Sequence, residues 1–208
     1  MAVNKRLLQG PTSGGALTPS ENFKVVTYTG NGGTQSITGV GFKPDFVWVK
    51  VRSTTGSGPL ADSTRGTRKA MYSNLTDADY TFPAGQGVTS FDADGFSIGD
   101  DSTGNGGYNG NGKTYVAWCW KANGGTTSSN TDGSVTSTVQ ANTAAGFSII
   151  KYTGNGSAGA TIGHNLGVIP DMFIVKMLTD AGNNWRVYHK GIDSTSPQNY
   201  NLALNSNS

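Results

Sequence analysis

The sequence is poor in charged residues and contains a single cysteine. Only 13% of its 208 residues are charged, about half the share in an average soluble protein. The net charge of +2 is too small and too scattered for the basic surface that binds nucleic acid. Since Cys119 has no second cysteine as a partner, an internal disulfide and zinc sites built on paired cysteines are excluded.

Long apolar runs are also missing. In residues 1–15 (MAVNKRLLQGPTSGG), only Leu7 and Leu8 follow the two basic residues, whereas a secretory signal needs about 7–15 apolar residues. No run approaches the roughly 18 apolar residues of a membrane span. We therefore expect a soluble protein that is made in a cytoplasm and does not insert into a membrane.

Glycine, in contrast, is abundant, with 31 residues, about twice the usual share. Short apolar runs alternate with turns rich in Gly, Asn, Asp and Ser, and no window keeps a helical period for more than about two turns. Between VTSF and FSIG, the segment DADG (Asp92–Gly95) predicts a hairpin turn because Asp-Gly readily adopts positive φ. These patterns predict an all-β fold, an antiparallel β-sandwich or jelly roll.

Two pairs of segments indicate an internal repeat. FKVVTYTGNG at 23–32 returns as FSIIKYTGNG at 147–156, and KPDFVWVK at 43–50 returns as IPDMFIVK at 169–176. Two matching blocks in the same order at nearly one spacing predict two tandem copies of one module. The predicted parts are an N-terminal arm (1–20), a first module (21–123), a linker or edge strand (124–146) and an incomplete second module (147–208).

The second copy is shorter than the first. LADSTRG and KAMYSN of copy one have approximate counterparts in WRVYHKG and NLALNS, but the strand candidates between about residues 88 and 122 have none. A β-module that lacks two strands exposes sheet edges and core. We expect either that the sequence is part of a longer chain or that a neighbouring subunit supplies the missing strands.

Two glycine motifs resemble nucleotide-binding loops. GYNGNGKT (Gly107–Thr114) fits the phosphate-loop pattern, and GNGSAG (Gly154–Gly159) fits the dinucleotide pattern. Both patterns work only when a helix follows the loop. The first motif leads instead into YVAWCWKA, which alternates as a strand does, and the second lies between two strand candidates. We therefore predict exposed loops, with Lys113 facing solvent and no bound cofactor.

The remaining chemical groups mark no active site. DADGFSIGDD holds four carboxylates, and the hairpin interpretation is favoured over a calcium loop, although irregular binding by Asp100 and Asp101 stays open. His164 and His189 are the only histidines, and no G-x-S-x-G elbow marks an activated serine. We expect no enzyme, and we assign no catalytic, cofactor-binding or metal-binding residue.

Three aromatic residues are candidates for surface contacts. Tyr108 lies in the glycine loop, and Trp185 and Tyr188 lie in GNNWRVYH. An exposed aromatic side chain flanked by amides can stack on a sugar or contact a protein partner. Packing inside the fold is the alternative for each of the three. Trp118 and Trp120, which share one strand face with Val116, are expected to lie in the core.

A family resemblance rests on several blocks in order. YTGNG…ITGVGFKPDFVWVK, followed by DSTRG, SFDADGFSIG and YVAWCWKA, resembles an uncharacterised domain that recurs in virion structural and tail-fibre proteins of tailed bacteriophages, many of them marine or cyanobacterial. It covers most of 23–122 and again 147–206. The resemblance implies a lectin-like β-sandwich and a non-enzymatic virion protein: a tail fibre, an appendage or a capsid decoration. The alternative is a carbohydrate-binding adhesin.

The resemblance also implies partners and a location. The partners would be other virion proteins (capsid, portal or tail components), further copies of the chain and, for an adhesin, a host surface glycan. The protein would be assembled in the host cytoplasm and then reside in the virion. The candidates for anchoring the N-terminal arm to the particle are Lys5, Arg6, Leu7 and Leu8.

Overall fold

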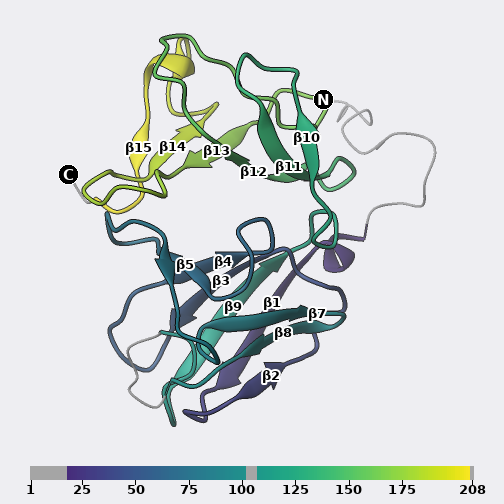
Figure 1. Ribbon diagram of the computed structural model, residues 1–208, viewed down its shortest axis with the longest axis vertical. Coiled ribbons are helices and arrows are strands. Elements are labelled where there is room, and N and C mark those ends of the chain that lie inside the picture. Colours follow the sequence, from purple (N-terminus) through teal and green to yellow (C-terminus); the bar gives the residue numbers. More distant parts are fainter. Residues whose placement is uncertain (1–17, 102–106, 207–208) are drawn as a thin grey trace, which may run out of the picture.

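The computed structural model describes residues 18–101 and 107–206, which form an all-β protein (Figure 1). All pairings between its named strands are antiparallel, so the predicted fold class is confirmed. The helical segments of this part of the chain are the single 3-10 turns η2 (Pro19–Glu21) and η3 (Pro197–Asn199). None of its helices is long and apolar enough to cross a membrane.

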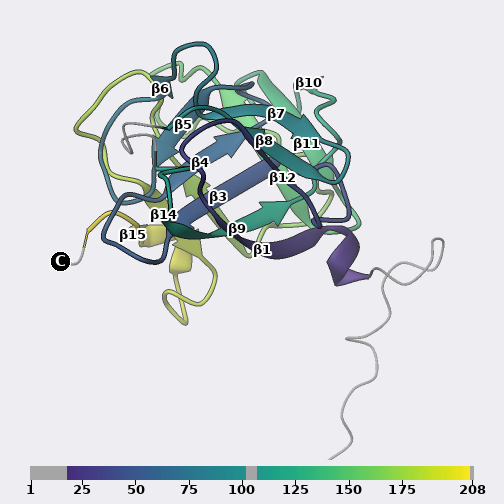
Figure 2. The ribbon, with the colours of Figure 1, turned by 90° about the horizontal axis from the view of Figure 1, so that it is seen from below.

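The first module is a sandwich of two sheets. The larger sheet has six strands in the order β1-β9-β3-β4-β5-β6, and the smaller has the order β2-β8-β7. Figure 2 shows the strands of the larger sheet following one another in this order. The bounds are β1 Phe23–Thr29, β2 Gln35–Ile37, β3 Phe46–Val51, β4 Pro59–Asp62, β5 Lys69–Tyr72, β6 Tyr80–Thr81, β7 Val88–Asp92, β8 Gly95–Ile98 and β9 Thr114–Trp120.

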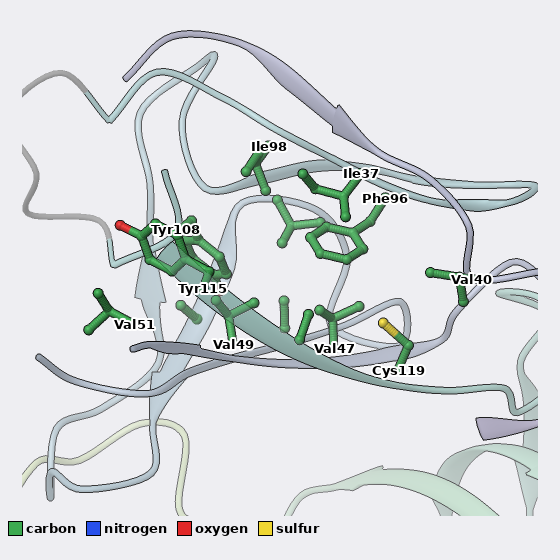
Figure 3. Close-up of a cluster of buried hydrophobic side chains, with 14 of the residues drawn as sticks. Ile37, Val40, Val47, Val49, Val51, Phe96, Ile98, Tyr108, Tyr115 and Cys119 are labelled. Carbon is green, nitrogen blue, oxygen red and sulfur yellow. The ribbon is translucent and has the colours of Figure 1, made fainter. Parts of the chain in front are cut away.

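The core of the first module lies between its two sheets. β9, which comes last in the chain, inserts between β1 and β3 and pairs with both. Because strand side chains alternate between the two faces, β9 directs Tyr115, Ala117 and Cys119 into the core, where Phe96 and Ile98 of β8 meet them (Figure 3). The opposite face of β9 carries the tryptophans.

The hairpin between β7 and β8 forms as its sequence predicts. Asp92 pairs with Gly95, so Ala93 and Asp94 make the turn. Gly95 has φ +148°, and a Cβ atom there would lie 1.9 Å from the carbonyl oxygen of Ile37; only glycine fits. The Asp94 carboxylate accepts hydrogen bonds from two backbone N–H groups at the end of the β2 loop, at 3.0 and 2.5 Å. Hydrogen bonds therefore hold the β7–β8 turn against the loop that follows β2.

The second module contains two sheets of three strands each, ordered β10-β11-β12 and β13-β14-β15. Residues 124–146 were predicted to form either a linker or an edge strand. They include β10 and β11, and β11 pairs with β12. The bounds are β10 Ser128–Asn130, β11 Ser137–Asn142, β12 Phe147–Tyr152, β13 Met172–Val175, β14 Arg186–His189 and β15 Leu202–Ala203.

The strand order of the second module follows the sequence repeat. β12 stands where β1 stands in copy one, and β13-β14-β15 repeats the order β3-β4-β5. One backbone hydrogen bond recurs as well: Ser63 N–H donates to the Asp45 carbonyl at 2.9 Å, and Lys190 N–H donates to the Asp171 carbonyl at 2.8 Å. The two copies therefore share strand order and hydrogen-bond register over these three strands.

The second module packs on the outer face of the large sheet of the first. Phe147 of β12 stacks on Trp120, with 6.2 Å between ring centroids. Trp185, which is 4% exposed, packs with Leu60 and Met71 of the first module. The Gln140 side chain adds hydrogen bonds to two hydroxyl groups of the first module, at 2.9 and 2.8 Å. The tryptophan face of β9 is thus an interface between the modules.

Candidate functional site on the open face of the second module

Equivalent side chains differ in exposure between the two modules. On the inner face of β3, Val47 is 0% exposed and Val51 is 7% exposed, because the sheet β2-β8-β7 covers them. Their repeat counterparts, Phe173 and Met177, are 48% and 45% exposed. The sequence pattern is the same, so the difference comes from the missing cover and not from the strand itself.

Cross-strand neighbours extend this exposed surface. Tyr188 of β14 stands opposite Phe173, and the two rings stack at a centroid distance of 4.8 Å and an interplanar angle of 16°. Tyr152 is exposed on β12, whereas its repeat counterpart Tyr28 is partly buried and packs against the core. We call the surface formed by Tyr152, Phe173, Met177 and Tyr188 the open face.

A shallow pocket of about 300 Å³ lies beside the stacked pair. Besides Phe173 and Tyr188, its lining residues are Arg186, Gln198, Asn199, Tyr200 and Asn201. The Arg186 guanidinium donates to the Asn201 amide oxygen at 3.0 Å. Aromatic faces beside a guanidinium and several amides can stack on a flat ligand and form hydrogen bonds with its polar groups. The lining contains no carboxylate; its polar groups are phenols, amides and a guanidinium, which can bind a ligand.

A second pocket, of about 460 Å³, lies among the loops that precede β13. Its polar groups are bonded to one another: the Asn130 amide donates to the Asp132 carboxylate at 2.9 Å and to the side chain of Asn165. His164 Nδ1 accepts the backbone N–H of Leu166 at 3.2 Å. Within the part of the chain that the structure describes, no group of three or more potential metal ligands occurs. The polar groups of this pocket hold the loops in shape.

Tyr108 does not lie on the surface, so its prediction as a surface contact is wrong. The side chain is 1% exposed and belongs to the core cluster (Figure 3). Its ring packs against Phe82 at a centroid distance of 5.9 Å, and its carbonyl accepts the Tyr28 hydroxyl at 2.7 Å. The glycine loop turns inward because an aromatic ring gains free energy when it leaves water. Burial raises the pKa of the Tyr108 phenol.

The prediction of Trp185 as a surface contact is also wrong, since its side chain is buried between the modules. Its indole N–H donates to the carbonyls of Tyr72 and Leu75, at 3.0 and 3.2 Å. A buried indole needs such a partner, and the first module provides two. The alternation in WRVYH contained the signal, because Trp185 and Val187 share one face and both are buried. Of the three predicted aromatic residues, Tyr188 alone lies on the open face.

The phosphate-loop motif serves the fold instead. Strand β9 begins at Thr114, where a nucleotide-binding loop would require a helix. The Gly110 N–H donates to the Tyr115 hydroxyl at 2.8 Å, and the Lys113 carbonyl accepts the N–H of Gly30, also at 2.8 Å. Lys113, predicted to face solvent, is half-buried. The groups that would cradle a phosphate are engaged inside the module.

The other candidate residues from the sequence either accept hydrogen bonds from the backbone or lie outside the described residues. The Asp101 carboxylate accepts the buried N–H of Asn109 at 2.9 Å. His189 Nδ1 accepts the N–H of Gly191 at 3.0 Å, in the same kind of turn as His164. The predicted anchoring residues lie outside residues 18–101 and 107–206; they are Lys5, Arg6, Leu7 and Leu8.

The sequence did not predict a buried ion-pair network in the first module. Arg65 contacts the carboxylates of Asp62 and Asp79, and it also donates to the Leu60 carbonyl at 2.9 Å. Burial by itself would lower the pKa of Arg65, but the two carboxylates outweigh this effect and the pKa stays above its ordinary value. The charges of this network pair with one another, and none of its residues lines either of the two pockets.

Comparison with known proteins identifies a family but no characterised relative. No curated protein and no solved structure matches the chain. A family model does match residues 18–208, a range that includes both modules. The chain therefore belongs to the family described as "Domain of unknown function (DUF7483)".

Proposed function

We propose that the protein is a non-enzymatic structural component of a bacteriophage virion, whose second module contacts neighbouring virion proteins through the open face. It would serve as a tail fibre, an appendage or a capsid decoration. The observation that carries the proposal is the exposure of Phe173 and Met177 at positions whose counterparts are core residues in the first module. The resemblance of the repeated blocks to a domain of tailed-phage structural proteins supports the virion assignment.

The chemistry of the open face favours a protein partner. Contiguous apolar patches on a protein surface commonly mark interaction sites. Complete burial of a large apolar side chain contributes about 1.5–3 kcal/mol, so covering the exposed halves of Phe173 and Met177 would contribute about 1 kcal/mol each. Burial of Tyr152 and Tyr188 would add to this while their hydroxyl groups stay at the rim.

The two histidines are consistent with a non-enzymatic protein. Each uses its Nδ1 atom to accept a backbone N–H two residues later in the chain. This fixes both imidazoles within local turns of the second module, whereas a general base has to be aligned with a nucleophile or a substrate. Their positions are those of loop-stabilising side chains.

Location tests the virion proposal. Particles purified by density gradient from cells that produce the chain would be analysed by peptide mass spectrometry across the fractions. Peptides of this chain should sediment with the capsid protein at constant stoichiometry. If the chain stays entirely in the fractions of free protein, it is not a virion component.

A matched pair of variants tests the open face. Phe173→Glu should reduce incorporation into particles by at least about tenfold, since a buried carboxylate opposes association. Tyr80→Glu is the control, because Tyr80 is also 48% exposed but lies on the first module. Equal incorporation of both variants would show that the open face is not the contact surface.

The pocket supports a second candidate function, a carbohydrate-binding adhesin. The specific observation is the stacked pair of Phe173 and Tyr188 next to the bonded Arg186 and Asn201. On a glycan array, saturable binding should be lost in Tyr188→Ala and kept in the control Tyr80→Ala. Binding that survives Tyr188→Ala would place the sugar site elsewhere.

A further inference from the structure

A carboxylate is bound by one loop of the first module. The loop between β2 and β3 turns through Gly39 and Gly41, whose φ angles are +85° and +83°. Their N–H groups donate to the Asp94 carboxylate, one to each oxygen, at 3.0 and 2.5 Å. Backbone N–H groups that converge on one acceptor in this way form an anion-binding nest. Asp94, which the β7–β8 turn carries, is therefore the ligand of this loop.

The second module repeats the loop. GVGFKPD at 39–45 corresponds to NLGVIPD at 165–171, in the register that also relates β13 to β3. Asn165 and Gly167 stand where the first module has its two nest glycines, and their φ angles of +57° and +71° lie in the same left-handed region. Asparagine tolerates this conformation better than most residues that have a side chain. The backbone of the nest is thus conserved between the two copies.

Two N–H groups of the repeated loop have no acceptor. Within residues 18–101 and 107–206, neither the Asn165 N–H nor the Gly167 N–H donates a hydrogen bond. Both residues are exposed and line the pocket of about 460 Å³ that lies before β13. The N–H of Leu166, between them, donates to His164 Nδ1 at 3.2 Å. The loop therefore offers the same two donors that bind Asp94 in the first module.

Contacts within the second module hold this loop in shape. Asn130 is 4% exposed, and its amide donates to the Asn165 side chain. A Cβ atom at Gly163 would lie 1.7 Å from Asn130 Oδ1, so only glycine fits there. Because the loop is already ordered, a ligand does not have to supply the free energy of ordering it.

We propose that the loop of residues 164–168 is a carboxylate-binding site whose ligand is an aspartate side chain carried on a tight turn. The ligand class follows from Asp94, which fills the equivalent loop. The turn follows from the apolar flank: Val168 and Ile169 are 66% and 89% exposed, whereas Phe42, the counterpart of Val168, is 5% exposed. A ligand that brings apolar neighbours would cover this flank. The site would accept such an aspartate from this chain or from another, and it is independent of the open face and of the virion role.

The pocket lining contains two titratable side chains, Asp132 and His164. The Asp132 carboxylate accepts the Asn130 amide at 2.9 Å, and its charge opposes a second carboxylate in the same pocket. We therefore expect weak binding of a free carboxylate. Asp132→Asn keeps an oxygen that can accept the Asn130 amide and should tighten the binding at least about twofold.

Titration of the full chain with sodium acetate is the first test. Backbone amide shifts would be followed by NMR, with sodium chloride at equal ionic strength as the control. The N–H signals of Asn165 and Gly167 should move downfield and saturate, because each N–H begins to donate to a charged oxygen. The N–H of Leu166, which His164 already accepts, should move much less.

The first module contains the matched control. In the wild-type chain the N–H groups of Gly39 and Gly41 should not respond to acetate, because Asp94 occupies them. In Asp94→Ala they should respond as those of Asn165 and Gly167 do. Asp94 is exposed on its turn, so its truncation leaves the core of the module unchanged.

A cyclised peptide of residues 90–97 (SFDADGFS) tests for an aspartate on a turn. It should bind at least about tenfold more tightly than acetate, because it also covers the apolar flank. Its Asp94→Asn form keeps Asp92 and should bind at least about tenfold more weakly than the parent peptide, because the charged acceptor of two hydrogen bonds is lost.

The outcomes are distinct. If neither probe produces a saturable shift at Asn165 and Gly167, or if chloride produces an equal shift, the loop is not a carboxylate site. Equal affinity for acetate and the peptide would identify a small free carboxylate as the ligand and overturn the assignment to an aspartate on a turn. None of these results depends on where the chain is found in particles, so the virion proposal stands or falls separately.

Discussion

Replacing Trp185 by alanine should undock the second module from the first. The indole is 4% exposed, packs with Leu60 and Met71, and donates its N–H to two carbonyls of the first module. It is the largest of the buried side chains in this cluster. Its removal leaves a cavity between two surfaces that can separate. The lost free energy should therefore lower the equilibrium constant for docking of the two modules.

The magnitude follows from the size of the side chain. Truncation of a buried tryptophan to alanine costs about 3–5 kcal/mol. Since each 1.4 kcal/mol is a factor of ten, the ratio of docked to undocked molecules should fall by about a hundred to a few thousand. Trp185→Phe keeps most of the apolar area and loses only the indole hydrogen bonds, which should cost about 1–2 kcal/mol.

Two amides that bridge the modules provide the assay. The Asp79 N–H donates to the Leu178 carbonyl at 2.8 Å, and the Gly182 N–H donates to the Thr76 carbonyl at 3.1 Å. In Trp185→Ala both should exchange with solvent faster by the factor given above, while the core amide of Cys119 keeps its protection. Wild-type exchange at both amides, or an equal loss at Cys119, would refute a docking role for Trp185.

Three further predictions concern the first module. Arg65→Met leaves the buried Asp62 without its cation and leaves Asp79 only the Lys69 ammonium, 3.6 Å away. It should lower the free energy of unfolding in urea by about 3–5 kcal/mol; a loss below about 1 kcal/mol would contradict the network. Hydrogen bonds from two backbone N–H groups hold the pKa of Asp94 below its ordinary 3.8. The stability that Asp94 contributes should thus be present above pH 3.8 and disappear as the pH falls through the lower pKa of the folded state. Asp94→Asn should lack this pH dependence in acid titrations followed by circular dichroism. Burial raises the pKa of Cys119 to about 12, so a thiol reagent at pH 8 should react with the unfolded chain and not with the native protein; rapid native labelling would contradict this burial.

Local patterns in the sequence predicted much of the fold. The Asp-Gly turn predicted the β7–β8 hairpin, and the alternation of YVAWCWKA predicted strand β9 and excluded the helix that a nucleotide site requires. These predictions succeed because turn conformation and the period of two are properties of neighbouring residues. The repeated blocks also pointed to the second module, although the exposure of Phe173 and Met177 became visible only in the folded chain.

Side-chain positions that depend on distant contacts were not predicted in this way. The tryptophans of β9 share a face that was expected to be core, yet the core of the first module is built on Tyr115, Ala117 and Cys119. Both faces of β9 are covered, one by the small sheet and the other by the second module. Alternation shows that two faces differ, and it does not show what covers each.

By itself, the sequence determined the all-β class, the tandem repeat and the absence of a nucleotide-binding helix, because each depends on residues close together in the chain. Only the tertiary structure decided that Tyr108 fills the core, that Trp185 joins the modules and that Tyr188 stands on an open face. Burial depends on which surfaces meet across many residues, and a hydrophobic side chain moves to whichever surface removes it from water. The same reasoning explains the open face, which has the sequence of a core but is not covered by any strand among residues 18–101 and 107–206.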